Sequence, residues 1–380
     1  MESTNQPVVF VFTDWYLPGY KAGGPISSCA NLISALGDSV RFKVVCGDRD
    51  YLDEEPYPDV VLNKWITTGH ADVMYISAAK RKYSVIKKLL SDNKSDHVYI
   101  NGLFSRVFSI FPLLAATKLQ LKTIIAPRGM LAPGALGLKS RKKQAFLNLG
   151  KSFGVYRKSV FHATHAHEAA HILENIHSDC KIVELANIPK IVFPATRSRK
   201  KKANVLRMVS VARIAREKNI DFALNCLRGM PGHIQIHFTL IGPVYDAGYS
   251  ERCRSIALPE NVTLEWVGPK TPIETGKLIG DSDLFFLPTL GENYGHAILE
   301  ALLCGIPVLI SDQTPWTSLS ANGLGLDLPL GDTAPYRKYI EKVSEMDGAA
   351  YALAFGSVAE KATKLVVLPE LIAGYKSLFE

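Results

Sequence analysis

The sequence predicts an α/β protein built from two units of similar size, each made of parallel βαβ units. Three observations support this prediction. The chain has 380 residues, which is more than one ordinary hydrophobic core accommodates. Short β-branched runs alternate with helical patterns, as they do in successive βαβ units. This alternation stops near residue 190 and then begins again.

The first unit is predicted from buried strand patterns that end in turn signals. Residues 8–13 (VVFVFT) have the pattern of a buried strand. Residues 25–37 are expected to form the next helix, because Pro25 suits a first helical turn and Gly37 suits a helix end. Further strands are expected at 41–47, 97–102 and 122–129.

The second unit follows residues 186–204, whose two prolines and basic cluster predict a linker between domains. We therefore expect an N-terminal domain of residues 1–190 and a C-terminal domain of residues 191–365. The second domain is expected to contain a helix at 219–230 and strands at 205–213, 234–242, 261–268, 283–289 and 306–312. Ligands of such sheets bind beyond the carboxyl ends of the strands, which predicts a site in a cleft between the two units.

The composition is that of a globular protein, with 47% hydrophobic and 21% charged residues. The sequence has no apolar run of the ~18–20 residues that a membrane-spanning helix needs, and its start lacks the pattern of a signal peptide. The six cysteines are scattered without a CxxC pair. This pattern favours reduced thiols and a cytoplasmic protein over a disulfide framework or a zinc site.

The net charge of +8 is partly concentrated in two basic clusters, residues 138–143 (LKSRKK) and 197–202 (RSRKKK). One interpretation is a solvated surface and a linker. The other is attraction to a phosphate-bearing partner, either an anionic membrane face or a lipid-phosphate substrate. Nucleic acid is disfavoured as a partner, because no aromatic residues are interleaved with these clusters.

Two glutamates stand out in the stretch 287–312, LPTLGENYGHAILEALLCGIPVLISD. Glu292 falls in a Gly-rich loop after a predicted strand, and Glu300 falls one turn into an otherwise apolar helix that Gly305 ends. The start of this helix offers free N–H groups to a sugar or phosphate. A carboxylate among leucines needs a partner such as the hydroxyls of a ribose, or an exit to water. Both interpretations of Glu300 stay open from the residues alone.

This stretch resembles the Glu–seven residues–Glu signature of retaining glycosyltransferase family 4, a GT-B family with two Rossmann-like domains that face across a cleft. The resemblance covers most of the chain and is strongest from about residue 205 to 325. It implies that Glu292 contacts the transferred sugar and that Glu300 holds the nucleotide ribose. It also implies backbone contacts to the donor from Asn293, Tyr294 and Gly295. His296 follows this loop directly and either contacts the phosphate or sugar of the donor or has no role at the helix start.

A second matching stretch is SVARIAREKNIDFAL, residues 210–224. In the family, an arginine and a lysine here bind the donor diphosphate, which implies these roles for Arg213 and Lys218. Both follow a predicted strand, where two cations can neutralise a departing nucleoside diphosphate. Asn219 replaces the glycine that usually follows the lysine, so the local turn is the uncertain part of the match.

Two further segments belong to the first unit. Gly23 and Gly24 precede the first predicted helix and allow a backbone to approach a phosphate closely. Arg128 ends a predicted strand at the place where many family members have a histidine, and the wording APRGML resembles a bacterial surface-polysaccharide subgroup. Arg128 can bind a phosphate of donor or acceptor, or it can be a structural arginine paired with a carboxylate.

The histidine-rich segment FHATHAHEAAHILE, residues 161–174, is not expected to bind a metal, because it has no HExxH pattern and no third ligand. Thr164 and Glu168 match a helix start of the family, and Thr164 or His165 is expected to cap that helix. No carboxylate pair suits a magnesium-bound nucleotide, and no cofactor is expected.

These inferences together predict a hexosyltransferase-type enzyme (EC 2.4). It would move a sugar from a UDP- or GDP-sugar to a glycan or lipid-linked glycan in polysaccharide biosynthesis, with retention and without a metal. The catalytic residues would be Glu292, Arg213, Lys218 and Arg128, and the C-terminal helix 366–380 would pack back on the N-terminal, acceptor-binding domain. Two alternatives remain: a catalytically silent sugar-nucleotide or glycan-binding protein of the same fold, and a GT-B epimerase or phosphorylase.

Overall fold

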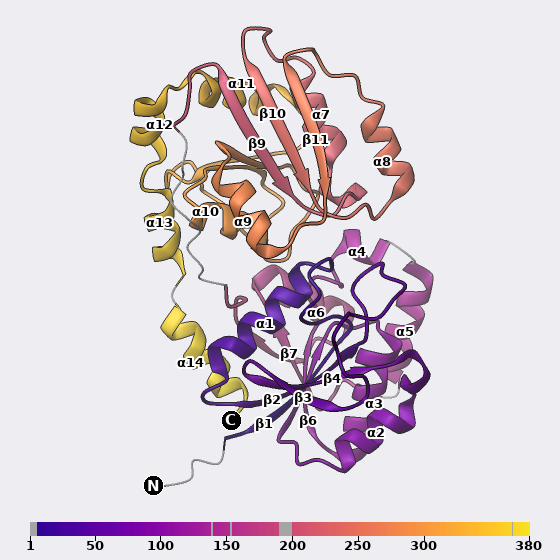
Figure 1. Cartoon of the computed structure of the whole chain (residues 1–380). Coiled ribbons are helices and arrows are strands. Elements are labelled where there is room, and N and C mark those ends of the chain that lie inside the picture. Colours follow the sequence, from indigo (N-terminus) through magenta and orange to yellow (C-terminus); the bar gives the residue numbers. More distant parts are fainter. Residues whose placement is uncertain (1–5, 138–139, 153, 190–199, 367) are drawn as a thin grey trace. The chain divides into compact units, whose positions relative to one another are not determined.

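The computed structural model of the chain describes residues 6–137, 140–152, 154–189, 200–366 and 368–380. These residues form two compact units, Met1–Pro189 with Val367–Glu380 and Lys190–Val366 (Figure 1). Most of the predicted linker, and residues 138–139 and 197–199 of the two basic clusters, lie outside the described residues. We describe each unit by itself.

The first unit contains a sheet of eight strands, seven of which run in parallel. The edge strand alone pairs with its neighbour in the antiparallel sense. Across the sheet, the strands are in the order β3 (Trp65–Thr68), β4 (Ala71–Ile76), β2 (Arg41–Gly47), β1 (Val8–Thr13), β5 (His97–Asn101), β6 (Lys122–Ala126), β7 (Ser159–Ala163) and β8 (Lys181–Glu184).

Helices cover both faces of this sheet, so its central strands are apolar on both sides. In β1, Val9 and Val11 pack on one face, and Phe10 and Phe12 pack on the other. The Val9 face is covered by α1 (Gly24–Leu36) and α14 (Leu368–Leu378), which lie side by side (Figure 1). The opposite face is covered by α2 (Tyr83–Ser91), α3 (Phe111–Leu119), α5 (Ser140–Ser152) and α6 (Ala166–Asn175). The short elements of this unit are η1 (Ala78–Lys80), η2 (Arg106–Ile110) and α4 (Pro133–Gly137).

The second unit contains a fully parallel sheet of six strands. Their order is β11 (Val262–Gly268), β10 (Gln235–Ile241), β9 (Val205–Val211), β12 (Leu284–Leu287), β13 (Val308–Ser311) and β14 (Gly325–Leu328). Along the chain, the strands β9, β10 and β11 follow one another toward one edge of the sheet, and the strands β12, β13 and β14 then follow one another toward the other edge. The strand order therefore reverses between β9 and β12, and this reversal defines where a ligand site is expected.

The helices of the second unit pack around a single core of aliphatic and aromatic side chains. They are η3 (Arg216–Lys218), α7 (Ile220–Leu227), α8 (Ala247–Arg254), α9 (Pro272–Gly280), α10 (His296–Leu303), α11 (Ala334–Glu345), α12 (Gly348–Phe355) and α13 (Val358–Leu365). Among them, α10 is almost wholly buried, because it carries apolar residues on nearly every side.

The predicted α/β fold with two parallel sheets is confirmed, and every strand named from the sequence is present. The predicted ranges tend to run one to three residues too far at the carboxyl end, as at residues 122–129, where β6 ends at Ala126. Several strands were not predicted, including β4, β7 and β14. Among the described residues, no helix is long and apolar enough to cross a membrane.

Candidate functional site

The candidate site of the second unit lies at the carboxyl ends of the neighbouring strands β9 and β12, where the strand order reverses. Side chains and N–H groups of the loops after these two strands converge there, because parallel strands end at the same edge of a sheet. Four residues of the predicted site come from this edge or from the start of the following helix: Arg213, Lys218, Glu292 and Glu300.

The loop after β9 carries both predicted cations. Arg213 follows the strand by two residues, and Lys218 ends the turn η3. Asn219 then adopts a left-handed conformation with φ of 53° before α7 begins. Asparagine tolerates this conformation better than most residues. The asparagine that replaces the family's glycine therefore still supports the left-handed turn.

The loop after β12 is held to the first loop by the backbone of Glu217. The carbonyl oxygen of Glu217 accepts hydrogen bonds from the Leu290 N–H at 2.8 Å and from the Thr289 hydroxyl at 2.9 Å. Further along, the Glu292 N–H donates to the carbonyl oxygen of Gln313 at 3.1 Å. These bonds fix the loop that carries Glu292 beside the loop that carries Lys218.

The side chains of Lys218 and Glu292 form an ion pair across the two loops, with 2.5 Å between Nζ and Oε1. The side chains are only 13% and 16% exposed. Removing two charges from water is costly, and such a pair is weak evidence for stability alone. Its place at the strand reversal makes it a stronger indication of a binding function.

Arg213 is more exposed and has two neighbours. Its Nη2 lies 3.1 Å from Oε1 of Glu217, and its guanidinium carbon lies 5.1 Å from the ring centre of Tyr245. Tyr245 follows β10, the other neighbour of β9, and is 47% exposed. The two cations Arg213 and Lys218 are thus each paired with one carboxylate. A diphosphate that binds here must compete with Glu217 and Glu292 for them.

The start of α10 completes this edge. Gly295 precedes the helix with φ of 77°, and no side chain caps the first turn. Trp316 supports the loop, because its Nε1 donates to the carbonyl oxygen of Tyr294 at 2.6 Å, and the rings of Tyr294 and His296 lie 4.8 Å apart. Glu300 is half-buried, whereas its neighbours along the helix are buried. Its side chain is therefore at the margin of the core.

In the first unit, Gly23 and Gly24 begin α1. Gly23 has φ of 66°, and its N–H donates to the carbonyl oxygen of Tyr20 at 3.0 Å. The preceding loop is fixed by the buried carboxylate of Asp50, which accepts the N–H groups of Tyr20 and Lys21 at 2.7 and 3.0 Å. The first turn of α1 has no side-chain cap, so its N–H groups can bind an anion.

Arg128 also belongs to the first unit and is part of a polar network. Its Nε donates to Asn101 at 2.7 Å, its Nη2 donates to the hydroxyl of Tyr99 at 2.7 Å, and its Nη1 donates to Asn187. These partners are neutral oxygens, in contrast to the carboxylate expected for a structural arginine. The backbone here is unusual, since Arg128 and Gly129 both have positive φ. The predicted contact of Arg128 with a phosphate stays a prediction.

The histidine-rich segment folds as the start of α6. His165 is the N-terminal cap and accepts the N–H of Glu168 at 3.3 Å, which confirms the predicted cap. The buried carboxylate of Glu168 accepts the hydroxyl and N–H of Thr164 and the N–H of Gly129. Within the described part of the chain, no group of three His, Cys, Asp or Glu residues is placed to hold a metal ion.

Three residues of the second unit's site were not predicted from the sequence: Glu217, Tyr245 and Trp316. The i,i+4 spacing of Arg213 and Glu217 is a signal that could have found the first. Tyr245 and Trp316 come from distant stretches that only the sheet order brings to this edge. The sequence therefore contains no local signal for them.

The comparisons with known proteins concern the enzyme class and the fold. Residues 194–348 match the sequence model of the family Glycosyl transferases group 1. The match falls within the second unit and covers less than half of the chain. No curated protein matches the chain in sequence. The predicted enzyme class, a glycosyltransferase, is confirmed at this level.

Solved structures of glycosyltransferases share the whole fold. Sucrose-phosphate synthase from Thermosynechococcus elongatus superposes with a TM-score of 0.67 at 14% identity, with 98% of each chain covered. HepE from Anabaena, in complex with UDP and glucose, gives a TM-score of 0.69 at 13% identity, with 98% of this chain and 99% of that chain covered. WaaG, a glycosyltransferase involved in lipopolysaccharide biosynthesis, gives 0.65 at 13% identity, with coverage of 98% and 99%. The predicted GT-B fold class is confirmed.

Proposed function

We propose that the protein is a retaining, metal-independent glycosyltransferase of family 4. It transfers a sugar from a UDP- or GDP-sugar to a glycan or a lipid-linked glycan acceptor in polysaccharide biosynthesis. In this proposal the second unit binds the donor and the first unit binds the acceptor. The enzyme works in the cytoplasm, and its basic clusters attract it to the anionic inner face of the membrane.

The observation that carries the proposal is the ion pair of Lys218 and Glu292 at the strand reversal of the second unit. When the donor binds, Lys218 and Arg213 exchange their carboxylate partners for the diphosphate. Glu292 is then free to accept a hydrogen bond from a hydroxyl of the transferred sugar, while Glu300 binds the ribose. Two structures of the related HepE from Anabaena contain UDP with glucose and UDP-glucose, which supports a donor of this kind.

The chemical step follows from these contacts. The acceptor hydroxyl oxygen forms a bond to the anomeric carbon as the bond from that carbon to the diphosphate breaks. The departing diphosphate takes the hydroxyl proton on the same face of the sugar, so the anomeric configuration is retained. Arg213 and Lys218 stabilise the negative charge that develops on the diphosphate. In this way the cations supply the charge that a metal ion supplies in other transferases.

Two substitutions of the ion pair test the proposal. In Lys218→Gln, we expect UDP to bind about 10- to 100-fold more weakly, because a charge-assisted contact is lost and Glu292 keeps an uncompensated charge. In Glu292→Gln, UDP should bind at least as tightly as in wild type, because Lys218 loses its competitor, while sugar transfer should fall sharply. Isothermal titration with UDP and GDP and a transfer assay with a panel of UDP- and GDP-sugars measure both effects.

Lys277→Gln is the matched control, because Lys277 is an exposed lysine on α9 of the same unit. It should leave UDP affinity and turnover unchanged. Donor binding without turnover would favour the catalytically silent alternative. Conversion of the nucleotide sugar in the absence of any acceptor would favour an epimerase. If UDP and GDP bind equally well to wild type and Lys218→Gln, the donor site is not at this edge.

A further inference from the structure

An aromatic side chain lies beside one of the two cations that are proposed to bind the donor diphosphate. The ring of Tyr245, in the loop after β10, has its centre 5.1 Å from the guanidinium carbon of Arg213. Tyr245 is 47% exposed, and the side chain of Arg213 also reaches solvent. The two side chains together therefore present a cation and an aromatic ring at the carboxyl edge of the sheet.

Backbone hydrogen bonds fix the loop that carries this ring. The Ile214 N–H donates to the carbonyl oxygen of Pro243 at 2.9 Å, and the carbonyl oxygen of Ile214 accepts the N–H of Tyr245 at 3.1 Å. Asp246, the next residue, forms an ion pair with Arg216 at 3.0 Å. The backbone of Tyr245 is thus held on both sides, and a ligand does not have to order it.

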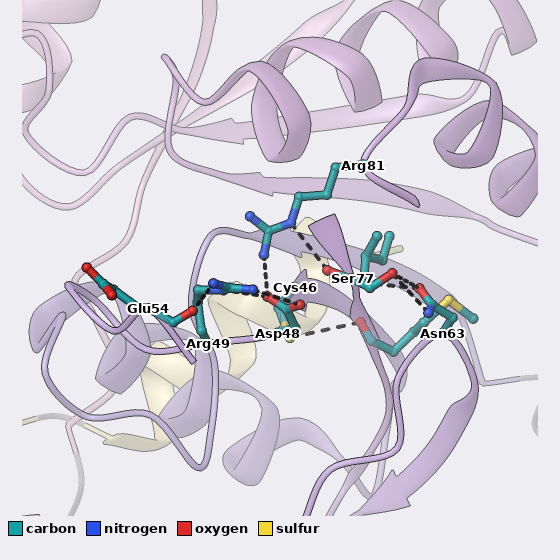
Figure 2. A network of polar contacts seen from close by, with 9 residues as sticks. Cys46, Asp48, Arg49, Glu54, Asn63, Ser77 and Arg81 are labelled. Carbon is teal, nitrogen blue, oxygen red and sulfur yellow. Dashed lines mark hydrogen bonds and ion pairs between the residues drawn. The ribbon is translucent and has the colours of Figure 1, made fainter. Parts of the chain in front are cut away.

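The arginines in Figure 2 belong to the first unit and are bound differently from Arg213. Figure 2 shows Asp48 between the guanidinium groups of Arg81 and Arg49. Asp48 is buried and accepts from Arg81 at 2.6 Å and from Arg49 at 3.0 Å. Glu217, the carboxylate partner of Arg213, is partly exposed. A phosphate can displace Glu217 more easily than Asp48, because the released carboxylate of Glu217 can be hydrated.

Three other aromatic rings of this site pack against one another. The ring centre of Tyr294 lies 4.8 Å from that of His296 and 6.2 Å from that of Trp316. All three residues are half-buried, whereas Tyr245 is exposed. Tyr245 is therefore the more accessible ring for a planar ligand.

A nucleoside diphosphate has the two groups that this arrangement suits. Its phosphates bind cations, and its base is a flat ring that is separated from the nearer phosphate by one ribose. With the diphosphate on Arg213, the base must lie close to this cation. Tyr245 is the aromatic residue in contact with Arg213. Stacking on an aromatic side chain is open to every base, because every base has a π-face.

We propose that Tyr245 is the stacking surface for the nucleobase of the donor. The diphosphate binds Arg213 in place of Glu217, and the base stacks on the ring of Tyr245 beside it. Stacking stabilises a pyrimidine or a purine alike, so this contact selects a nucleoside diphosphate over a bare diphosphate without choosing the base. This inference rests on the proposed function, since it adds a base-binding residue to the proposed donor site.

The variants Tyr245→Ala and Tyr245→Phe test this stacking by isothermal titration of the full chain with UDP, GDP and inorganic pyrophosphate. In Tyr245→Ala, UDP and GDP should bind about 5- to 100-fold more weakly, because a base-stacking ring is lost. Pyrophosphate has no base and should bind as it does to wild type. Tyr245→Phe keeps the aromatic face and should bind all three ligands as wild type does.

Ile273→Ala is the control, because Ile273 is an exposed apolar residue on α9 of the same unit. It should bind UDP as wild type does. If Tyr245→Ala does not fold, Tyr245→Leu takes its place, since leucine keeps apolar bulk without an aromatic face.

Two results would overturn the stacking role. One is UDP binding that is undiminished in Tyr245→Ala. The other is an equal loss of UDP and pyrophosphate in that variant, because Tyr245 would then act only by holding Arg213. Failure of wild type to bind UDP, GDP or pyrophosphate counts against the proposed function instead.

Discussion

At the residue scale, the most unusual titratable group is His162, which is 0% exposed in the first unit. Its Nδ1 accepts the hydroxyl of Tyr99 at 2.7 Å, and its Nε2 donates to the carbonyl oxygen of Leu185 at 2.8 Å. The Tyr99 hydroxyl in turn accepts a hydrogen bond from Nη2 of Arg128. Burial, and then the charge of Arg128, lower the pKa of His162 from 6.5 to about 3. The folded protein therefore holds this histidine neutral.

This neutral histidine predicts a loss of stability in acid. Between pH 6.5 and 3 the unfolded chain binds a proton at His162 and the folded chain does not, so the free energy of unfolding falls as the pH falls through this window. We expect His162 to account for roughly 2 kcal/mol of the loss between pH 7 and pH 5. Urea unfolding of wild type and His162→Gln at several pH values measures it, since the variant should lack this part of the pH dependence.

The control for that experiment is His177→Gln, because His177 is an exposed histidine of the same unit. Its pH dependence should follow that of wild type. Equal slopes in wild type and in His162→Gln would mean that His162 titrates normally in the folded state.

Residue-scale prediction from sequence succeeded in placing side chains at strand ends, but it could not find their partners. The order of strand and turn was enough to put Arg213 and Lys218 after β9. The neighbours of these cations could not be read in the same way, because Tyr245 comes from the loop after a different strand. The neutral hydrogen-bond partners of Arg128 could not be predicted from the sequence either, because they depend on which strands are adjacent in the sheet.

At the element scale, the proposed donor site of the second unit depends on one glycine. Gly242 follows β10 with φ of 146°, and a Cβ atom there would lie 2.1 Å from the carbonyl oxygen of Ala212. Ala212 directly precedes Arg213. The Gly242 N–H also donates to the carbonyl oxygen of Gly268 at 3.0 Å, so the loops after β9, β10 and β11 meet at this residue.

Gly242→Ala should therefore damage both stability and donor binding. We expect the free energy of unfolding to fall by about 2 kcal/mol or more, because the positive φ and the backbone clash both oppose a side chain. UDP should bind more weakly, since the carbonyl that must move adjoins Arg213. Gly276→Ala is the control, because its helical position in α9 has no atom within 4 Å. That variant should gain roughly 0.5–1 kcal/mol. Similar results for both variants would contradict the argument.

Some of the strands that sequence patterns missed have a physical reason. Edge strands are short and only partly buried, so their apolar pattern is weak, as in β3 and β8. β14 begins at Gly325, where a Cβ atom would lie 1.9 Å from the carbonyl oxygen of Val308. β14 therefore pairs with β13 because the glycine lets the two backbones come close together, and this cannot be seen in a pattern of apolar side chains. Predicted strands such as β1 and β12 are central and apolar on both faces. Burial does not account for every case, because the edge strand β11 was predicted and the interior strands β4 and β7 were not.

At the scale of the whole molecule, the sequence contained the alternation of strands and helices but not the strand order. Each sheet reverses its order once, between β1 and β5 and between β9 and β12. Parallel pairing and right-handed connections restrict the order without fixing it. The candidate site at Lys218 follows from the second of these reversals. The resemblance to a family could therefore name the residues expected to bind the donor, while the strand order that brings them together was known only from the sheet itself.

Residues 368–380 complete the hydrophobic core of the first unit. Phe379 is 0% exposed, and its ring lies 5.9 Å from the rings of Phe42 and Tyr99 in the first unit. The Tyr375 hydroxyl lies 3.1 Å from the carbonyl oxygen of Ala186 and donates to it. The helix α14 thus supplies part of a core whose strands were formed from residues more than 200 positions earlier.

Phe379→Ala tests whether the segment that ends the last helix, α14, stabilises the first unit specifically, because Phe379 directly follows this helix. We expect a loss of about 3–5 kcal/mol for a phenylalanine removed from a packed core. Hydrogen exchange should increase in β2 and β5, which contact this ring, and in β1, which lies between them. It should stay unchanged in β9 and β12. UDP affinity should also be retained, because the proposed donor contacts all belong to the second unit. Lys376→Ala, an exposed change within α14, should leave both readouts unaltered. A uniform rise in hydrogen exchange across both sheets would instead mean that the two units unfold together. In that case, the stability of the proposed donor site could not be separated from that of the core to which α14 contributes.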